Sequence, residues 1–247
     1  MEKNELLRRM EDLCERAERS GTVCSSGYLS PAERYQTEKW AKQRGCTVVF
    51  SGGGADCERT AAFFLPEYMS EEYFDPSEHF AAIKLTAHFG TPGHRDYMGA
   101  LLGMGVGREW VGDIRVMGDT AYIFCLPSVH RHLLSIDKVG RCGVTAENIA
   151  PGDVPQAKRE VREKSFSVMS MRLDAVTAGM FDLSRTEAAR EIRLGNVSLN
   201  YEQCEKPDAQ ISAGDIISLR GAGKGSVTGT GGTSRKGRLF VYAEILK

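Results

Sequence analysis

The sequence has 247 residues, of which 41% are hydrophobic and 26% charged, and its mean hydropathy is −0.31. This globular composition excludes a wholly disordered or fibrous chain, and the length predicts two domains or three small ones. No apolar run approaches the roughly 20 residues that a membrane-spanning helix needs, and the charged N-terminus lacks an apolar signal segment, so a cytoplasmic protein is expected.

Charge is unevenly distributed along the chain. Residues 1–157 carry 17 Lys and Arg against 22 Asp and Glu, a net charge of −5, whereas residues 158–247 carry 15 against 11, a net charge of +4. A basic C-terminal third attached to an acidic body favours a polyanion-binding module joined to something else.

The cysteines are spread singly: Cys14, Cys24, Cys46, Cys57, Cys125, Cys142 and Cys204. No Cys-x-x-Cys pair exists, so the spacing predicts neither a zinc ribbon nor a dithiol redox site. The odd number also argues against a disulfide framework, and free thiols in a reducing compartment are expected.

Residues 1–75 are predicted to form an N-terminal α/β domain. Ser51-Gly52-Gly53-Gly54 lacks the Lys of a phosphate-binding loop and the spacing of a dinucleotide fingerprint, so it is interpreted as a tight turn between a strand and a helix. The predicted elements are helices over 2–20 and 31–44, the second opened by a Ser30–Glu33 capping box, a strand over 46–50 and a helix near 55–64.

Residues 76–156 are predicted to form a middle α+β module, and Pro151-Gly152-Asp153 marks its end. Gly118-Asp119 is typical of a hairpin turn because both residues accept a positive φ. The predicted elements are a strand over 79–88, a helix over 95–104, a hairpin of 114–117 with 121–126, a helix over 127–136 and a strand or loop over 143–149.

The C-terminal segment combines two short helices with a small sheet. A second capping box, Ser184 to Glu187, opens the second helix, and Gly195 ends it. Residues 221–237 hold seven glycines and no large apolar side chain, and are therefore predicted to be a mobile loop. The remaining predicted elements are a helix over 171–181 and strands over 197–200, 216–220 and 238–246.

Arg185 lies in the first turn of the predicted second helix, where free N–H groups favour a phosphate, and the planar guanidinium can donate two parallel hydrogen bonds to one. A solvated basic helix face would also explain this pattern. The linked pattern of Arg172-Leu173-Asp174, Ser184-Arg185, Ala188, Gly195, Val197, Asn200 and Gly214-Asp215, however, resembles the S-four RNA-binding domain over about 165–247. That resemblance implies RNA contacts by Arg172, Ser184, Arg185, Arg190 and Arg193.

The chain departs from the S-four pattern at Tyr201-Glu202, where that family commonly has a glycine turn, and in its long glycine-rich segment. Lys224, Arg235 and Lys236 could add phosphate contacts there, or the segment could simply be disordered. Arg172-Leu173-Asp174 is also similar to the aspartate motif of pseudouridine synthases, but only 73 residues follow Asp174, too few for a catalytic domain. A structural position for Asp174 is therefore expected.

The block Gly93–Ile114 is distinctive in its glycines and charges, with His94, Arg95, Arg108 and Glu109 expected around its turns. A kinase site is rejected, because Leu101 stands where the His-Arg-Asp motif requires Asn. Upstream of an S-four domain, this block resembles the bacterial YlmH family. The resemblance implies an N-terminal α/β domain, a middle module like RNA-recognition motifs and a terminal S-four domain. It also implies an association with the cell-division gene neighbourhood and with ribosome-associated quality control.

The expected function is therefore a non-enzymatic RNA-binding protein that acts on ribosomal RNA and tRNA, on large ribosomal subunits that hold a stalled peptidyl-tRNA. No cofactor, metal or catalytic residue is predicted, and a monomer suffices. Two alternatives stay open. One is an RNA-modifying enzyme housed in residues 1–157, and the other is an adaptor for cell-division proteins with secondary RNA binding.

Overall fold

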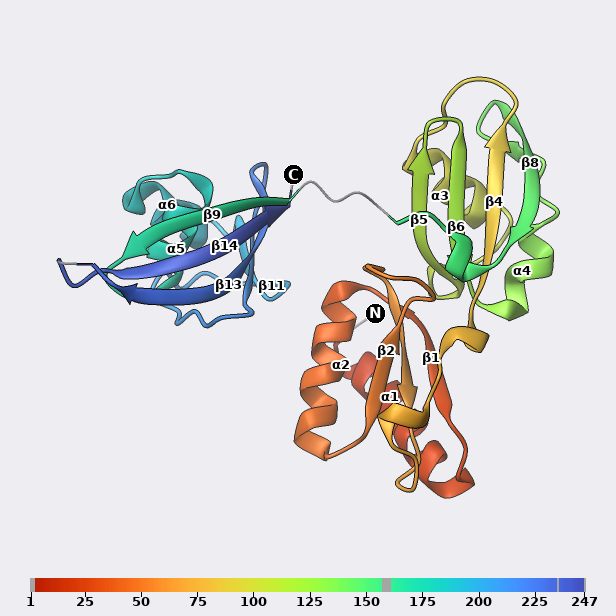
Figure 1. Ribbon diagram of the computed structural model, residues 1–247, viewed down its shortest axis with the longest axis horizontal. Helices are drawn as coiled ribbons and strands as arrows, with labels where there is room; N and C mark the ends of the chain where they lie inside the picture. The colour runs from red at the N-terminus through yellow and green to blue at the C-terminus, as the bar shows by residue number, and fades with distance from the viewer. Residues whose placement is uncertain (1–2, 157–160, 235, 247) are drawn as a thin grey trace. The chain divides into compact units, whose positions relative to one another are not determined.

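The computed structural model describes residues 3–156, 161–234 and 236–246. The chain divides into two compact units, Met1–Ala157 and Lys158–Lys247 (Figure 1). In the described part of the chain, no helix is long and apolar enough to cross a membrane. Short 3-10 turns connect the main elements of the first unit: η1 (Glu71–Tyr73), η2 (Ser77–His79), η3 (Arg108–Trp110) and η4 (Pro151–Asp153).

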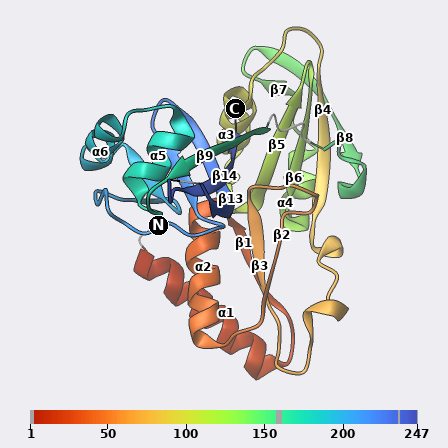
Figure 2. The ribbon, with the colours of Figure 1, turned by 60° about the vertical axis from the view of Figure 1, so that its left-hand side comes forward.

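The first unit begins with two helices on a three-stranded antiparallel sheet. Both helices, α1 (Lys3–Ser20) and α2 (Pro31–Arg44), have the expected bounds. The capping box at Ser30 and the left-handed Gly45 (φ 76°) set the two ends of α2. The strand order is β1 (Cys24–Leu29), β3 (Thr60–Phe64) and β2 (Val48–Ser51). Figure 2 shows α1 and α2 beside this sheet.

The prediction of a helix near 55–64 is wrong, because this segment contains β3. The strand β1 is also absent from the predicted elements. All five residues of β3 are buried, since the strand is central and covered on both faces. A short apolar run of this kind has no alternation that would distinguish a strand from a helix. The Ser51–Gly54 turn therefore joins two strands. A Cβ on Gly54 would lie only 2.7 Å from the Phe124 ring, which explains the glycine.

The rest of this unit is a second antiparallel sheet with two helices. Its elements follow the β-α-β-β-α-β order of ferredoxin-like folds, with an added short strand β7 (Lys138–Val139). The strand order is β5-β6-β4-β8-β7. Tyr97, Leu101 and Leu133, from the helices, share one core with Ile83 and Ile123, so both helices cover the same face. The bounds are β4 (Ala81–Ala87), α3 (His94–Gly103), β5 (Val111–Met117), β6 (Thr120–Cys125), α4 (Pro127–Leu133) and β8 (Cys142–Ile149).

The two sheets of the first unit are packed together. Tyr28 and Phe63 from the small sheet belong to one buried cluster with Phe80, Ala82 and Phe124 from the region of the large sheet. Since Ala82 and Phe124 alternate with the helix-facing residues of β4 and β6, this cluster lies on the helix-free face of the large sheet. Part of that face is therefore covered by the N-terminal segment.

The second unit is a six-stranded antiparallel sheet with two helices (Figure 1). The order is β11-β10-β12-β13-β14-β9, and β9, which is not predicted, pairs along the whole of β14. Leu173 and Val176 of α5 and Ile192 of α6 pack on Ile217 and Val241 of the sheet. The bounds are β9 (Val161–Val168), α5 (Leu173–Phe181), α6 (Arg185–Arg193), β10 (Val197–Leu199), β11 (Glu202–Gln203), β12 (Ile216–Leu219), β13 (Gly223–Thr233) and β14 (Leu239–Leu246).

The prediction of a mobile loop over 221–237 is wrong over most of its length, because β13 occupies Gly223–Thr233 and pairs with both β12 and β14. Two of these glycines are needed for close approach. A Cβ on Gly225 would lie 2.6 Å from Sδ of Met180, and one on Gly231 would lie 2.8 Å from the Tyr242 hydroxyl. Glycine in a strand commonly marks such close packing.

The turn between β10 and β11 forms without the glycine that the S-four pattern favours. Asn200 and Tyr201 both have positive φ, 50° and 67°, as a two-residue hairpin turn of this hand requires. The Asn200 amide donates to Asp215 Oδ1 over 2.8 Å, and its Oδ1 accepts from the Ile216 N–H. These bonds hold the turn, so the departure at Tyr201 leaves the hairpin intact.

Candidate nucleic-acid interface

The centre of the candidate site is Asp174, near the start of α5, whose side chain is only 7% exposed. Arg172, the N-cap residue of α5, donates from Nε to Oδ1 and from Nη2 to Oδ2, both over 3.2 Å. Arg185, at the first position of α6, donates from Nε to Oδ2 over 3.1 Å and from Nη2 to Oδ1 over 3.4 Å. One carboxylate therefore holds two guanidinium groups.

Burial by itself would raise the pKa of Asp174, but the hydrogen bonds and charges of Arg172 and Arg185 outweigh it and lower the pKa. Asp174 is therefore ionised at neutral pH, and the triad keeps a net charge of +1. Each guanidinium has five N–H donors and uses only two of them here. The side chains of Arg172 and Arg185 are 36% and 55% exposed, so donors remain available to a phosphate.

Ser184, a predicted RNA contact, is the N-cap of α6. Its hydroxyl accepts from the Glu187 N–H over 3.2 Å, while Glu187 Oε2 accepts from the Ser184 N–H over 2.9 Å. This capping box places the Glu187 carboxylate at the N-terminus of α6, where it already interacts with the positive end of the helix dipole. A phosphate would therefore have to be held by the arginines of this helix rather than by its N-terminus.

The other two predicted arginines of α6 lie on its exposed side, opposite the buried Ala188 and Ile192. Arg190 is 71% exposed and donates to Glu191 over 3.1 Å. Arg193 is exposed and makes no hydrogen bond or ion pair with the described residues. The structure thus places Arg193 on the same helix as Arg185, as an exposed cation.

Arg238 is a further candidate that the sequence does not indicate, because there it is only the first residue of the last predicted strand. Its Nη2 donates to the Ser167 carbonyl over 2.7 Å. Together with Arg185 it lines a groove of about 290 Å³, whose other lining residues are mostly small or apolar: Ser167, Val168, Met169, Ala175, Ala178, Gly179 and Leu183. The pairing of β9 with β14 creates this groove, and β9 itself is not predicted.

Two aromatic residues on β14 were also missed. Phe240 and Tyr242 are 40% and 47% exposed, whereas the intervening Val241 and the following Ala243 are buried. The alternation in this strand was the available signal for an outward aromatic face. Exposed aromatic rings on a sheet are surfaces on which nucleobases can stack.

The two basic residues of the glycine-rich segment that the structure describes, Lys224 and Lys236, are not gathered into one patch. Lys224 lies near the start of β13, with Nζ 5.8 Å from the centre of the Tyr201 ring. Lys236 is exposed in the turn beyond the other end of that strand, which at 3.3 Å per residue is roughly 30 Å away. Arg235 lies outside the described residues.

The candidates of the first unit also lie on separate elements. His94 and Arg95 are exposed at the start of α3, whose Asp96 accepts from the Gly93 N–H over 2.8 Å. Arg108 is in η3, and its carbonyl accepts from Arg59 Nη2 over 2.8 Å. No hydrogen bond or ion pair within the described ranges joins Arg108 to His94 or Arg95.

The helix-free face of the large sheet is the surface that RNA-recognition motifs use for stacking. Here Phe124 on that face is fully buried, against the Ser51–Gly54 turn and the Arg115 guanidinium, which lies 5.0 Å from the ring centre. Lys84 and Tyr122 on the same face are half-buried, and Lys84 forms an ion pair with Glu147 over 2.9 Å. Only part of this face is open to a ligand.

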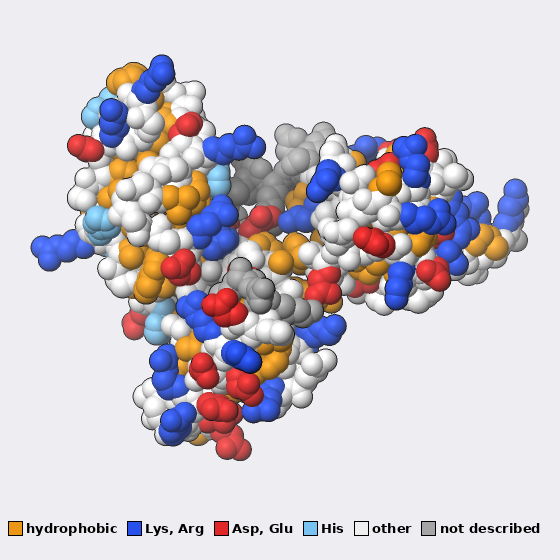
Figure 3. All heavy atoms as spheres, turned by 180° about the vertical axis from the view of Figure 1, so that it is seen from behind, with side chains coloured by type: hydrophobic (Ala, Val, Ile, Leu, Met, Phe, Trp, Pro, Cys, Tyr) orange, Lys and Arg blue, Asp and Glu red, His pale blue; other side chains and the backbone are white. Residues whose placement is uncertain are grey.

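Figure 3 shows one side of the molecule, on which blue Lys and Arg side chains are numerous over the second unit. Red acidic side chains are prominent over the N-terminal part of the first unit. This agrees with the net charges of +4 and −5 for the two segments of the sequence. The second unit is therefore the better surface for a polyanion.

Comparison with known proteins identifies an RNA-binding class. Residues 72–152, which contain the large sheet, match a family model described as "Putative RNA-binding domain in YlmH". The ribosome-associated protein quality control protein P2 of Bacillus subtilis (strain 168) is 30% identical over 224 residues, which cover 89% of this chain and 86% of that protein.

A solved structure titled cell division protein ylmH from Streptococcus pneumoniae matches with a TM-score of 0.53 and 19% identity. The match covers 60% of this chain and 92% of that one, and supports the fold. The chain belongs to the YlmH family, as its sequence motifs predict.

Proposed function

We propose that this protein binds structured ribosomal RNA and tRNA on the large ribosomal subunit, as a non-enzymatic component of ribosome-associated quality control. Its relative from Bacillus subtilis carries the name of a ribosome-associated quality control protein, and residues 72–152 match the RNA-binding domain model. The coarser function, an RNA-binding protein of this family, rests on those two matches. What we propose beyond it is that the RNA is ribosomal RNA and tRNA, and that the protein acts on the large ribosomal subunit.

The observation that carries the proposal is the pair of guanidinium groups held by Asp174. Each donates two hydrogen bonds to a carboxylate that is almost fully buried, so Arg172 and Arg185 are oriented before any ligand arrives. A preorganised side chain loses less conformational entropy on binding, and Arg suits phosphate through its planar donors. Arg193 adds a positive charge on α6 that has no partner among the described residues.

Structured RNA suits this site better than a free nucleotide does. The basic side chains of Arg185 and Arg193 on α6 and of Arg238 just before β14 are exposed, and the groove that Arg185 and Arg238 line is open to solvent. An extended phosphate backbone can reach several such cations at once, and RNA helices are recognised largely through phosphates and shape.

The test is the affinity of the full-length protein for ribosomal RNA fragments and for tRNA, measured by fluorescence anisotropy at several salt concentrations. For duplex DNA, the log–log slope is about −0.9 per phosphate contact, and a slope of similar order is expected here. An Arg185→Ala/Arg193→Ala double variant should bind several-fold more weakly and show a shallower slope. The matched control is Arg8→Ala/Arg9→Ala, which removes two exposed arginines from α1.

Equal losses in both double variants would mean that binding depends only on net charge, and the proposed interface would be wrong. Unchanged affinity and slope in the Arg185→Ala/Arg193→Ala variant would also contradict it. If the wild-type protein bound no RNA and instead retained cell-division proteins after nuclease treatment, the adaptor alternative would replace this proposal.

A further inference from the structure

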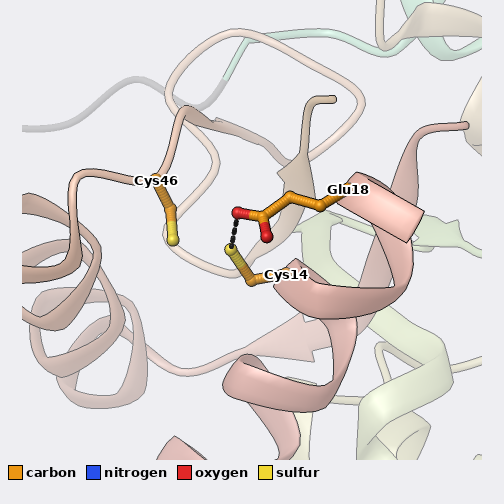
Figure 4. Close-up of side chains that lie close together, drawn as sticks. All are labelled: Cys14, Glu18 and Cys46. Carbon is orange, nitrogen blue, oxygen red and sulfur yellow. Dashed lines mark hydrogen bonds between the residues drawn. The ribbon is translucent and has the colours of Figure 1, made fainter. Parts of the chain in front are cut away.

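In the N-terminal part of the first unit, three side chains that could bind a metal converge although they are distant in the sequence. Cys14 and Glu18 are on α1, and Cys46 follows the end of α2 (Figure 4). Their ligand atoms all lie within 4.8 Å of one another. No other group of three His, Cys, Asp or Glu side chains this close occurs among the described residues.

Local structure explains how the three are presented. Cys14 and Glu18 are four residues apart, so they lie on the same side of the helix. The left-handed Gly45 ends α2, and the Gly45 and Cys46 N–H groups both donate to the Ala41 carbonyl, over 2.9 and 3.1 Å. These two bonds fix the backbone of Cys46 against α2, which packs on α1.

The separation of two of the ligand atoms fits a tetrahedral site. Cys14 Sγ lies 3.6 Å from Glu18 Oε1. With Zn–S near 2.3 Å and Zn–O of 2.0–2.2 Å, two tetrahedral ligand atoms are about 3.5 Å apart. The hydrogen bond from the Cys14 thiol to Glu18, dashed in Figure 4, therefore has the same length as one edge of a zinc coordination tetrahedron.

The chemistry of the donor set selects the ion. Two thiolates and one carboxylate match the soft and oxygen ligands that zinc accepts, whereas calcium and magnesium require oxygen ligands throughout. Among the described residues, neither thiol has a hydrogen bond or ion pair with a Lys or Arg side chain. The positive charge that two thiolates require would therefore come from the metal ion. Glu18 is exposed and Cys46 half-buried, which leaves a path for an ion from solvent.

We propose that Cys14, Glu18 and Cys46 bind one zinc ion, with the fourth position filled by water. The ion would join α1 to the segment between α2 and β2, in a part of the chain separate from the RNA-binding surface. No reaction is assigned to it, and its failure would leave the proposed function untouched.

The test uses the full-length, untagged protein, purified with a non-thiol reductant and without chelators. Zinc content is measured by elemental analysis, and Co²⁺ titration provides an optical probe, since Co²⁺ bound by thiolates in a tetrahedral site has charge-transfer and visible bands. We expect one metal per chain and both sets of bands. Added zinc should raise the melting temperature of the metal-free protein, because an ion that binds the native state stabilises it.

The variants separate ligands from bystanders. Cys14→Ser and Cys46→Ser should each lose the Co²⁺ charge-transfer bands, and Glu18→Gln should keep them but bind with lower affinity. Cys204→Ser, in the second unit, is the matched control and should behave as wild type. Because Cys14 is buried and its variant could be unstable, the half-buried Cys46 gives the decisive comparison.

Three results would overturn the assignment. The first is the absence of Co²⁺ bands at one equivalent with no zinc in the purified protein. The second is retention of the bands in Cys46→Ser. The third is a Cys14–Cys46 disulfide, found by mass spectrometry in protein prepared without reductant, together with no metal binding after reduction.

Discussion

At the scale of single residues, the site depends on a carboxylate that is itself largely hidden. Asp174 was expected to have a structural position, and the hydrogen bonds show how it acts: it orients Arg172 and Arg185, which come from different helices. Breaking a buried ion pair by removing one partner is costly, because the other charges lose their compensation. Stability and the geometry of the interface are therefore linked at Asp174.

The first prediction concerns Asp174→Asn. Losing the charge-assisted hydrogen bonds should lower the free energy of unfolding of the second unit by on the order of 1–3 kcal/mol at pH 7. Both tryptophans, Trp40 and Trp110, lie in the first unit, so tryptophan fluorescence would not detect this. Hydrogen exchange of the α5 amides should detect the loss of stability. Unchanged exchange in the variant would contradict the structural account.

The same residue predicts a pH dependence. The folded-state pKa of Asp174 is lowered, so its contribution to stability is present above the unfolded value near 3.9 and is lost as the pH falls through the folded value. Hydrogen exchange at pH 7 and below pH 4 should show an acid-induced loss of stability that is smaller in Asp174→Asn. An identical loss in both proteins would show that other carboxylates account for it.

The two arginines of α6 predict different outcomes. Arg193→Ala should weaken RNA binding while changing the free energy of unfolding by no more than about 0.5 kcal/mol, because its side chain is exposed and unpaired among the described residues. Arg185→Ala should weaken binding and also destabilise α5, since it leaves Asp174 with only one partner. Fluorescence anisotropy and hydrogen exchange on both variants separate these effects. An equal loss of stability in Arg193→Ala and Arg185→Ala would be inconsistent with the geometry.

At the scale of elements, the sequence predicts the observed α-helices but also a helix near 55–64 that does not exist, and it predicts the strands less well. Capping boxes at Ser30 and Ser184 are local signals, and the helices α2 and α6 begin immediately after them. β1, β3 and β9 are missed, because their strand character depends on partners far away in the chain. β3 is buried on both faces, and β9 is held by pairing with the last strand, β14.

Glycine has two opposite uses that composition alone does not distinguish. The seven glycines of 221–237 predict mobility, but two of them, Gly225 and Gly231, lie in β13 against larger side chains. The exposed Phe240 and Tyr242 lie beside this strand, and Gly231 is the position where a Cβ would meet both of them. These aromatics, together with Arg238, become visible as part of a surface only once the hairpin is known.

The structure of β13 can be tested with two alanine substitutions. Gly225→Ala should lower the free energy of unfolding by about 1–3 kcal/mol, because the added methyl group would overlap Met180 in a packed core. Gly229→Ala is the control, since a Cβ there meets nothing within 4 Å. Hydrogen exchange across β13 and β14 provides the measurement. If neither substitution lowered the free energy of unfolding, a loop over Gly223–Thr233 would be favoured instead of a strand.

At the scale of the whole molecule, the chain combines two compact units with opposite net charge. The family's RNA-binding domain match lies in the first unit, while the arginine pair and most of the proposed contacts lie in the second. Both the sequence resemblance and the comparisons lead to the same family. The cluster of Cys14, Glu18 and Cys46, by contrast, is invisible to spacing rules because 32 positions separate the two cysteines.

The most direct test of the central claim is co-sedimentation of the full-length protein with purified large ribosomal subunits that hold peptidyl-tRNA, at low and at high salt. The account predicts co-migration at low salt that is reduced at high salt, and its loss in the Arg185→Ala/Arg193→Ala variant but not in Arg8→Ala/Arg9→Ala. A wild-type protein that stays at the top of the gradient at both salt concentrations, or a double arginine variant of α6 that still co-migrates fully, would contradict it.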